Sequence, residues 1–210
     1  MKPTIKSLIC HLALAAPCFG AISFSLPGTS ESASWALTSA VHPGFNTFGT
    51  AANPWGSAVT PDAGTASALL NKIGGSGYIG SSFLYTAGAV GNFSISDTSS
   101  IASLATIVFQ GRISDPLVTM VLNYNGGSQG LPADFTNVVA GGPYPDRAWQ
   151  WDLSTISGIT SYEILYSGHH AATSLTVTTG DSFLQVIPEP STAVLGMATL
   201  GFTFIRRRRA

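Results

Sequence analysis

Few side chains in this sequence belong to the types that carry out nucleophilic or acid–base chemistry. Apart from His11 near the N-terminus, the histidines are His42, His169 and His170, and no G-x-S-x-G motif presents a serine nucleophile. A serine hydrolase needs a base within reach of its nucleophile, and the glycine-rich stretch Gly75-Ser76-Gly77 is not followed by a helix signal. The sequence therefore argues against a serine hydrolase.

Glycoside hydrolysis would require two carboxyl groups at a set separation in one sugar-binding site. Between the two ends of the chain, the only glutamates are Glu31 and Glu163. Glu163 lies between Tyr162 and Ile164 in a strand-like stretch, where we expect a solvent-facing position. Asp152 follows two tryptophans and is expected at a strand edge or turn. A secreted glycan-active enzyme is thus the least favoured function, and we predict that the protein is not an enzyme.

Metal-ligating residues are not grouped along the chain. His169 and His170 are adjacent, so in a strand they would point to opposite faces, and we expect exposed turn histidines. No D-x-D-x-D run is present to bind calcium. The carboxylates in or near predicted loops are Asp115, Asp134, Asp146 and Asp181. No cofactor is predicted, and a structural calcium ion stays open as an alternative without assignable ligands.

Aromatic side chains are the other candidates for binding, because an aromatic face attracts the C–H groups of a sugar ring. Trp149 and Trp151 have the i, i+2 spacing of one strand face and are expected to pack in the core. Trp55, in Asn53-Pro54-Trp55-Gly56, and Tyr144, in Pro143-Tyr144-Pro145, are predicted loop aromatics. We therefore predict Trp55 and Tyr144 as the candidate glycan contacts.

Strand formers and turn residues dominate the middle of the chain, and strong helix formers are scarce. The clearest predicted strands are 103–112, 117–124, 148–153, 161–167 and 174–179. Weaker strands are predicted at 33–40, 77–85, 92–96, 135–139 and 183–187, and only 65–72 favours a short helix. Glycine-rich turns such as Asn125-Gly126-Gly127 separate these strands. The pattern predicts an all-β fold, an antiparallel β-sandwich or jelly-roll-like body over 21–186.

The N-terminus has the pattern of a targeting segment. Two lysines precede an apolar stretch at 8–16, and small residues follow up to Gly20. This pattern is typical of a secretory signal peptide, which we predict over 1–20, to be recognised by the export machinery and removed by signal peptidase. A lipoprotein signal is the weaker alternative, because Pro17 before Cys18 is a poor fit to the small residue expected there.

The C-terminus consists of three distinct parts. It reads Pro188-Glu189-Pro190-Ser191-Thr192, then an apolar run over 193–205, then Arg206, Arg207, Arg208 and Arg209. A helix over 191–205 would be about 22 Å long, which is short for a bilayer core of about 30 Å. The arginines extend its reach by snorkelling and keep this end cytoplasmic. We predict a short transmembrane helix with the body facing outward; a plain C-terminal tail anchor is the alternative.

These three parts, in this order and together with a signal peptide, resemble the PEP-CTERM sorting signal over residues 187–210. The resemblance implies recognition by an exosortase, a membrane-embedded cysteine transpeptidase-like enzyme. It implies processing near Pro188, Glu189 and Pro190, followed by release or transfer to the cell surface. It also implies a Gram-negative-type bacterium that makes extracellular polysaccharide. The resemblance is limited mainly to residues 187–210. A weaker one, over 149–154 and 159–162, is to a stretch that recurs in the bodies of such surface proteins and carries no known chemistry, so neither says what the body binds.

The charge of the body excludes several partners. Residues 21–190 contain three cations, Lys72, Arg112 and Arg147, against ten carboxylates, a net charge of −7. Such a body is not expected to bind nucleic acid or anionic lipid. We therefore predict an exported surface or matrix protein, held transiently in the inner membrane, with a non-enzymatic structural role in a biofilm polysaccharide. The alternative is a carbohydrate-binding module that uses loop aromatics.

Overall fold

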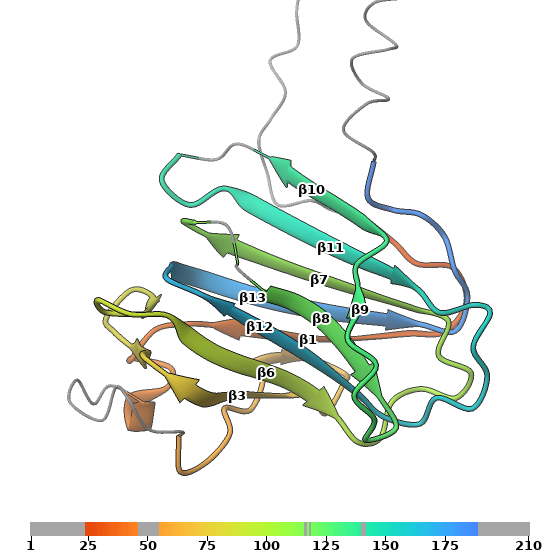
Figure 1. The fold of residues 1–210 in the computed structure, drawn as a ribbon, viewed down its shortest axis with the longest axis horizontal. Coiled ribbons are helices and arrows are strands. Elements are labelled where there is room, and N and C mark those ends of the chain that lie inside the picture. Colours follow the sequence, from red (N-terminus) through yellow and green to blue (C-terminus); the bar gives the residue numbers. More distant parts are fainter. Residues whose placement is uncertain (1–23, 46–54, 116, 118, 140–141, 189–210) are drawn as a thin grey trace, which may run out of the picture.

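The computed structural model of the chain describes residues 24–45, 55–115, 117, 119–139 and 142–188 (Figure 1). Within these residues the fold is all-β, with thirteen strands in two antiparallel sheets, one 3-10 turn at Pro43–Phe45 and no α-helix. No helix in this part of the chain is long and apolar enough to cross a membrane. The predicted signal peptide (1–20) and C-terminal helix (191–205) lie outside the described residues.

The two sheets differ in size. The eight-stranded sheet has the order β10 (Phe135–Val139), β11 (Asp146–Asp152), β7 (Thr106–Ile113), β13 (Ala171–Gly180), β1 (Ser30–Ala36) and β2 (Ala63–Gly64). The hairpin of β4 (Tyr78–Ile79) and β5 (Leu84–Tyr85) adds to this sheet by pairing β5 with β13. The five-stranded sheet has the order β3 (Leu69–Gly75), β6 (Gly91–Asp97), β12 (Tyr162–Gly168), β8 (Thr119–Tyr124) and β9 (Leu131–Pro132).

One hydrophobic core joins the two sheets, because alternate side chains of each point inward. Phe109 of β7 and Tyr166 of β12 approach to 5.6 Å between ring centroids. Two buried indoles also cross the core from the larger sheet. Trp35 donates its Nε1–H to the carbonyl of Val59 at 3.1 Å, and Trp151 donates to the carbonyl of Leu131 in β9 at 3.1 Å. Each indole N–H thus has a hydrogen-bond acceptor, and the two hydrogen bonds link the two sheets.

The five clearest strand predictions are confirmed as β7, β8, β11, β12 and β13, with shifts of a few residues at their ends. The prediction at 77–85 resolves into the β4–β5 hairpin, closed by a hydrogen bond of 2.8 Å from the Gly80 N–H to the Phe83 carbonyl. The helix predicted over 65–72 is wrong. Leu70 and Lys72 point inward from β3, and the strand pairs with β6. Backbone pairing therefore overrides the local helix preference.

The strand predicted at 183–187 is also wrong, because this segment pairs with no strand backbone. Its backbone bonds instead to the side chain of Gln150, which lies fully buried in β11. The Gln150 amide donates to the Leu184 carbonyl at 2.7 Å and accepts from the N–H groups of Val186 and Ile187 at 3.0 and 3.3 Å. A side chain thus takes the place of a neighbouring strand.

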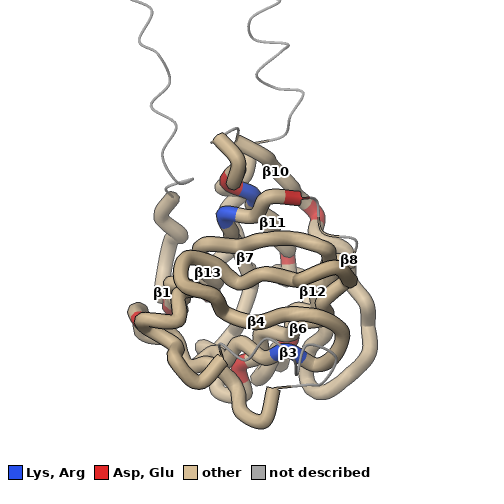
Figure 2. The backbone as a smooth tube through the Cα atoms, turned by 90° about the vertical axis from the view of Figure 1, so that its left-hand side faces the viewer, with Lys and Arg blue, Asp and Glu red and all other residues tan. Residues whose placement is uncertain are grey.

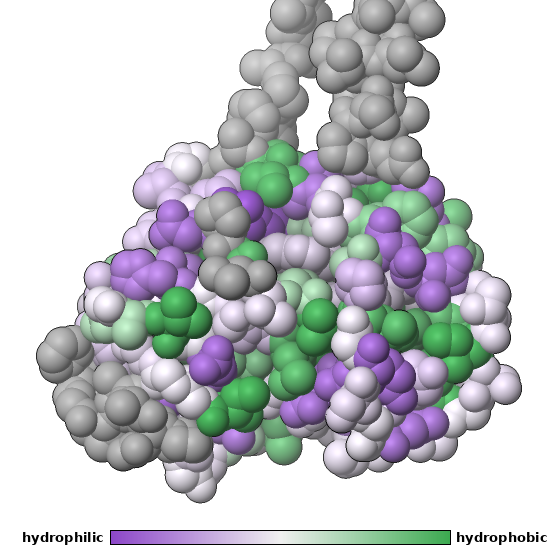
Figure 3. All heavy atoms as spheres, viewed as in Figure 1, coloured by the Kyte–Doolittle hydropathy of each residue, from purple (hydrophilic) through white to green (hydrophobic). Residues whose placement is uncertain are grey.

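The described ends of the chain meet on the outer face of the eight-stranded sheet, opposite the core. A second apolar cluster forms there from Leu26, Val108, Ala148 and Ile187. Residues 24–26 and 183–187 therefore cover one end of this face (Figure 1). The outer face of the five-stranded sheet is different, since apolar residues such as Ile73 lie there in small groups among polar ones (Figure 3).

Replacing Gln150 with Ala is expected to lower the free energy of unfolding by about 2 kcal/mol, because three backbone groups of 184–187 lose their partner. The amides of Val186 and Ile187 should also exchange with solvent faster. Urea unfolding and hydrogen exchange measure the two effects. Gln185→Ala is the matched control, because Gln185 is exposed and its side chain bonds only to the Ile187 carbonyl. Equal losses in the two variants would contradict this role of Gln150.

Candidate functional site

The outer face of the eight-stranded sheet is polar and rich in hydroxyl groups. Strand pairing aligns its outward residues in three rows across β1, β13, β7, β11 and β10. The rows are Ala36, Ser174, Arg112, Asp146 and Val139; Ser34, Thr176, Gln110, Ala148 and Asn137; Ser32, Thr178, Val108, Gln150 and Phe135. Neighbouring hydroxyls bond across the strands, with 3.0 Å between Ser34 Oγ and Thr176 Oγ1. The chain ends cover residues of the third row and Ala148 of the second.

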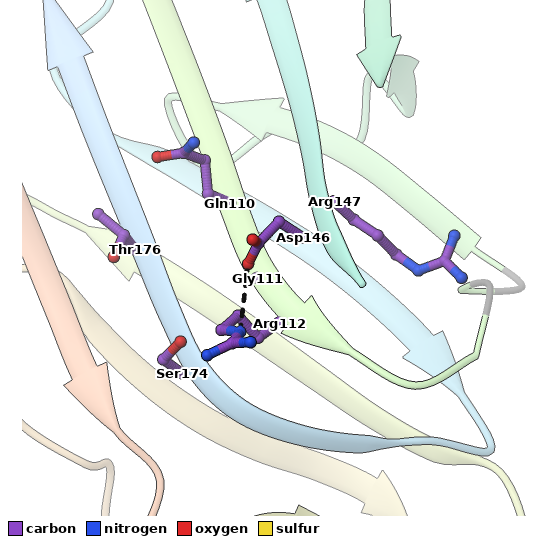
Figure 4. A pocket seen from close by; sticks show the side chains of 7 residues that line it. All are labelled: Gln110, Gly111, Arg112, Asp146, Arg147, Ser174 and Thr176. Carbon is purple, nitrogen blue, oxygen red and sulfur yellow. Dashed lines mark ion pairs between the residues drawn. The ribbon is translucent and has the colours of Figure 1, made fainter. Parts of the chain in front are cut away.

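Two hollows follow this face and share Gln110. The first, of about 80 Å³, is lined by Gln110, Gly111, Arg112, Asp146, Arg147, Ser174 and Thr176 (Figure 4). The second, of about 310 Å³, lies beside residues 24–26 and is lined mainly by hydroxyl side chains, Thr178 and Ser32 among them. Thr176 and Thr178 are successive outward residues of β13, so the two hollows are continuous along the strands. We call them together the outer groove.

One ion pair lies in the outer groove. Arg112 Nε approaches Asp146 Oδ1 to 3.4 Å, with side chains 51% and 12% exposed, respectively (Figure 4). Arg147 turns away and donates its Nε–H to the Ile113 carbonyl at 3.2 Å. Burial lowers the pKa of Arg147, and the Asp115 carboxylate opposes this shift. Among the described residues, cations are sparse (Figure 2): Lys72 lies in β3 of the other sheet, and Arg112 and Arg147 lie at the ends of β7 and β11.

An aromatic cluster lies at the same end of the eight-stranded sheet as this ion pair, where β5 pairs with the start of β13. The rings of Tyr78, Phe83, Tyr85, Tyr144 and His169 form a chain of contacts with centroid separations of 6.0–6.5 Å. These rings come from the β4–β5 hairpin, the loop before β11 and the turn before β13. They are half-buried or exposed, and they belong to neither hydrophobic core cluster. The cluster is therefore an aromatic surface at the edge of the sheet.

Strand alternation places this cluster on the same face as the groove. Ile79 and Leu84 point into the core, so Tyr78 and Tyr85 beside them point outward. β5 pairs with the start of β13, and a bulge between Ala172 and Ser174 follows directly. Bulges re-aim side chains and are common beside binding sites. The tyrosines and the Arg112–Asp146 pair therefore lie at one end of one sheet face.

No protein-family model, curated protein or solved structure matches this chain. Its candidate site is therefore described from its own geometry. The outer groove offers hydroxyls, one compensated ion pair and aromatic rings at one end. Such groups form hydrogen bonds and stacking contacts, and planar polar side chains beside aromatic faces are the usual means of fixing a polar ligand's orientation.

The structure places the two predicted glycan contacts in different surroundings. Trp55 is half-buried and packs against the core, with its ring 5.0 Å from Phe45 and 6.0 Å from Phe93. Tyr144 is half-buried and joins the aromatic cluster through Phe83, at 6.2 Å. Of the two, Tyr144 alone belongs to the aromatic cluster, and it lies two residues before Asp146, which lines the first hollow. Trp55 has the contacts of a packing residue.

The predicted sorting residues lie at the edge of the described chain. Ile187 is fully buried, and Pro188, the next residue, is exposed. Glu189, Pro190 and the arginines 206–209 lie outside the described residues. Among the described residues, Ile187 is therefore the core contact nearest to the predicted processing motif, and it directly precedes Pro188.

The two adjacent histidines confirm the expectation of opposite faces, but one of them is not an exposed turn residue. His169 is exposed, whereas His170 is buried between Phe93 and Tyr166, at 5.7 and 6.1 Å. Among the described residues, no three His, Cys, Asp or Glu side chains are grouped to hold a metal ion. Glu163 lies half-buried on the outward side of β12, as expected. Asp152 accepts the Ser154 N–H at 3.0 Å in a turn, also as expected.

Sequence reasoning did not identify Tyr78, Phe83, Tyr85, Arg112 and Asp146 as site residues. A signal for the first three was present, because aromatic residues flank the turn at 80–83. The Arg112–Asp146 pair had no local signal. The two residues are brought together by the register of β7 and β11.

Proposed function

We propose that this chain is an exported surface or extracellular-matrix protein, sorted by an exosortase-like enzyme, with a β-sandwich body that has a structural, non-enzymatic role among extracellular polysaccharides. The inner membrane would hold it transiently through the C-terminal helix. The observation that carries this proposal is the junction at Ile187 and Pro188, where the buried part of the chain gives way to an exposed residue. A processing enzyme needs an accessible motif, and the exposure of Pro188, the first residue of the predicted motif, supports the proposal.

Several carboxylates of the body accept hydrogen bonds from the backbone of the chain itself, which supports a structural role for the protein. Asp62 accepts the N–H of Ala36 at 2.5 Å, and Asp181 accepts that of Thr29 at 3.0 Å. This hydrogen bond from Thr29 is the main cause that lowers the pKa of Asp181. Asp97 accepts from Ser99 in the same way, at 2.8 Å. These acids stabilise turns and strand ends, which is the role of Asp in folded loops.

Intact-mass spectrometry of the protein from its host, with and without the exosortase, tests the sorting proposal. We expect a chain that ends near Pro188 to Pro190 when the enzyme is present. Without the enzyme, the mass should include Arg206, Arg207, Arg208 and Arg209. A mass that retains the four arginines in both strains would show that the tail is a plain membrane anchor.

A further inference from the structure

We propose that the outer groove binds a linear, uncharged polysaccharide, with the aromatic cluster as its stacking platform. This inference does not rest on the sorting of the chain. Tyr85 and Tyr144 would contribute ring faces, Arg112 and Asp146 would hydrogen-bond sugar hydroxyls at the same end, and the serines and threonines of β1 and β13 would line the path beyond.

The shape of the groove favours a chain rather than a small molecule. The first hollow is small and open along β13 and β7, and it continues through Gln110 into the larger hollow beside residues 24–26. A compact metabolite is normally enclosed on most sides by its pocket. A groove that runs along the strands instead exposes successive units of an extended ligand to similar groups.

The chemistry of the groove favours sugars over other polymers. Its surface presents neighbouring hydroxyl groups, such as Ser32 beside Thr178, and these both donate and accept hydrogen bonds as sugar hydroxyls do. The rings of the aromatic cluster carry negative faces that attract the C–H groups of a sugar. A nucleic acid would require clustered cations, whereas here Arg112 is paired with Asp146 and Arg147 donates to the Ile113 carbonyl.

The charge of the groove favours an uncharged polysaccharide over an acidic one. The charges of Arg112 and Asp146 compensate each other, with 3.4 Å between Nε and Oδ1. Arg147 points away toward the Ile113 carbonyl. Glu31 adds a negative charge to the wall of the larger hollow. Residues 21–190 together have the net charge of −7 derived above from three cations and ten carboxylates. Polyanions would therefore be repelled by the groove and by the body around it.

Affinity electrophoresis of the purified full-length chain tests this inference. Native gels contain laminarin, dextran or hydroxyethylcellulose as neutral probes, or polygalacturonate as an acidic one. We expect retardation by at least one neutral glucan and none by polygalacturonate. Tyr85→Ala should weaken binding about tenfold and Arg112→Gln about fivefold, as the loss of central contacts does. Tyr85→Phe, which keeps the ring, should bind within about twofold of the wild type.

The matched control is Ile73→Ala, which truncates an exposed side chain on the outer face of the other sheet. It should bind like the wild type. Should Tyr85→Ala not fold by circular dichroism, Arg112→Gln decides, because its side chain is half exposed. The inference is wrong if no neutral glucan retards the chain, if polygalacturonate retards it more, or if Ile73→Ala and Tyr85→Ala weaken binding equally. A dimer in gel filtration that Tyr85→Ala abolishes would instead assign the face to a second copy of this chain.

Discussion

Lowering the pH from 7 to 4 is expected to remove about 3 kcal/mol of folding stability through His170 alone. Burial lowers the pKa of His170 from 6.5 to about 4, although the nearby Gly168 backbone and the Asp115 carboxylate favour the protonated ring. Above pH 6.5 the imidazole is neutral in both states and contributes nothing. As the pH falls below 6.5, only the unfolded chain takes up the proton, so unfolding becomes progressively easier until about pH 4.

The comparison that isolates this effect is between wild type and His170→Leu, with urea unfolding measured at pH 7, 6, 5 and 4. The carboxylates contribute equally to both proteins, so the difference between their stabilities reports the imidazole. We expect the variant to lose about 3 kcal/mol less than the wild type over this range. His169→Leu is the matched control, because this neighbour is exposed, and it should follow the wild type. Parallel curves for wild type and His170→Leu would refute the assignment.

His170 also shows where sequence patterns stop being informative. Two adjacent histidines in a turn predict solvent exposure, because neither position has an apolar periodicity of its own. In the structure, the Thr86 hydroxyl and backbone hold the His170 backbone by bonds of 2.7–3.1 Å, from 84 residues away. The ring is thereby directed onto Phe93 and Tyr166. A contact between residues so far apart along the chain cannot be predicted from the local sequence.

The strands themselves were largely predictable, since alternation such as that of Leu175 and Val177 in β13 depends only on neighbouring residues. The two wrong elements, at 65–72 and 183–187, both depend on distant partners. In the first, the backbone of β3 pairs with β6 and bridges Leu70 to Val59. In the second, the side chain of Gln150 takes the hydrogen bonds that a strand would have taken.

The positions of the two predicted loop aromatics could not be read from the sequence. Tyr144 joins the aromatic cluster through Phe83. Trp55 has the same loop context, yet it packs on Phe93 because its segment folds back onto β3 through the Lys72 carbonyl, at 3.0 Å from the Trp55 nitrogen. Contacts between segments distant in the sequence decide which loop aromatic joins the core. The residue types alone do not reveal these contacts.

Truncating Trp151 to Ala is expected to lower the free energy of unfolding by about 3–5 kcal/mol. The indole is only 1% exposed and occupies the core between the sheets. Its loss would leave a cavity and an unpaired Leu131 carbonyl, which now accepts the indole N–H at 3.1 Å. Since a whole domain is stable by about 5–15 kcal/mol, one substitution would remove a large part of the total. Urea unfolding followed by circular dichroism measures it.

Trp149→Ala is the matched control, because Trp149 lies on the same strand face but is only half-buried, stacked on Phe109 at 5.4 Å. We expect it to cost about 2 kcal/mol, roughly half as much. Trp151→Phe separates packing from hydrogen bonding, since it keeps an aromatic ring and loses the bond to β9; about 1–2 kcal/mol is expected. Equal losses at positions 149 and 151 would mean that the indole of Trp151 does not join the sheets. The difference in stability between Trp151→Ala and Trp151→Phe would then reflect side-chain volume alone.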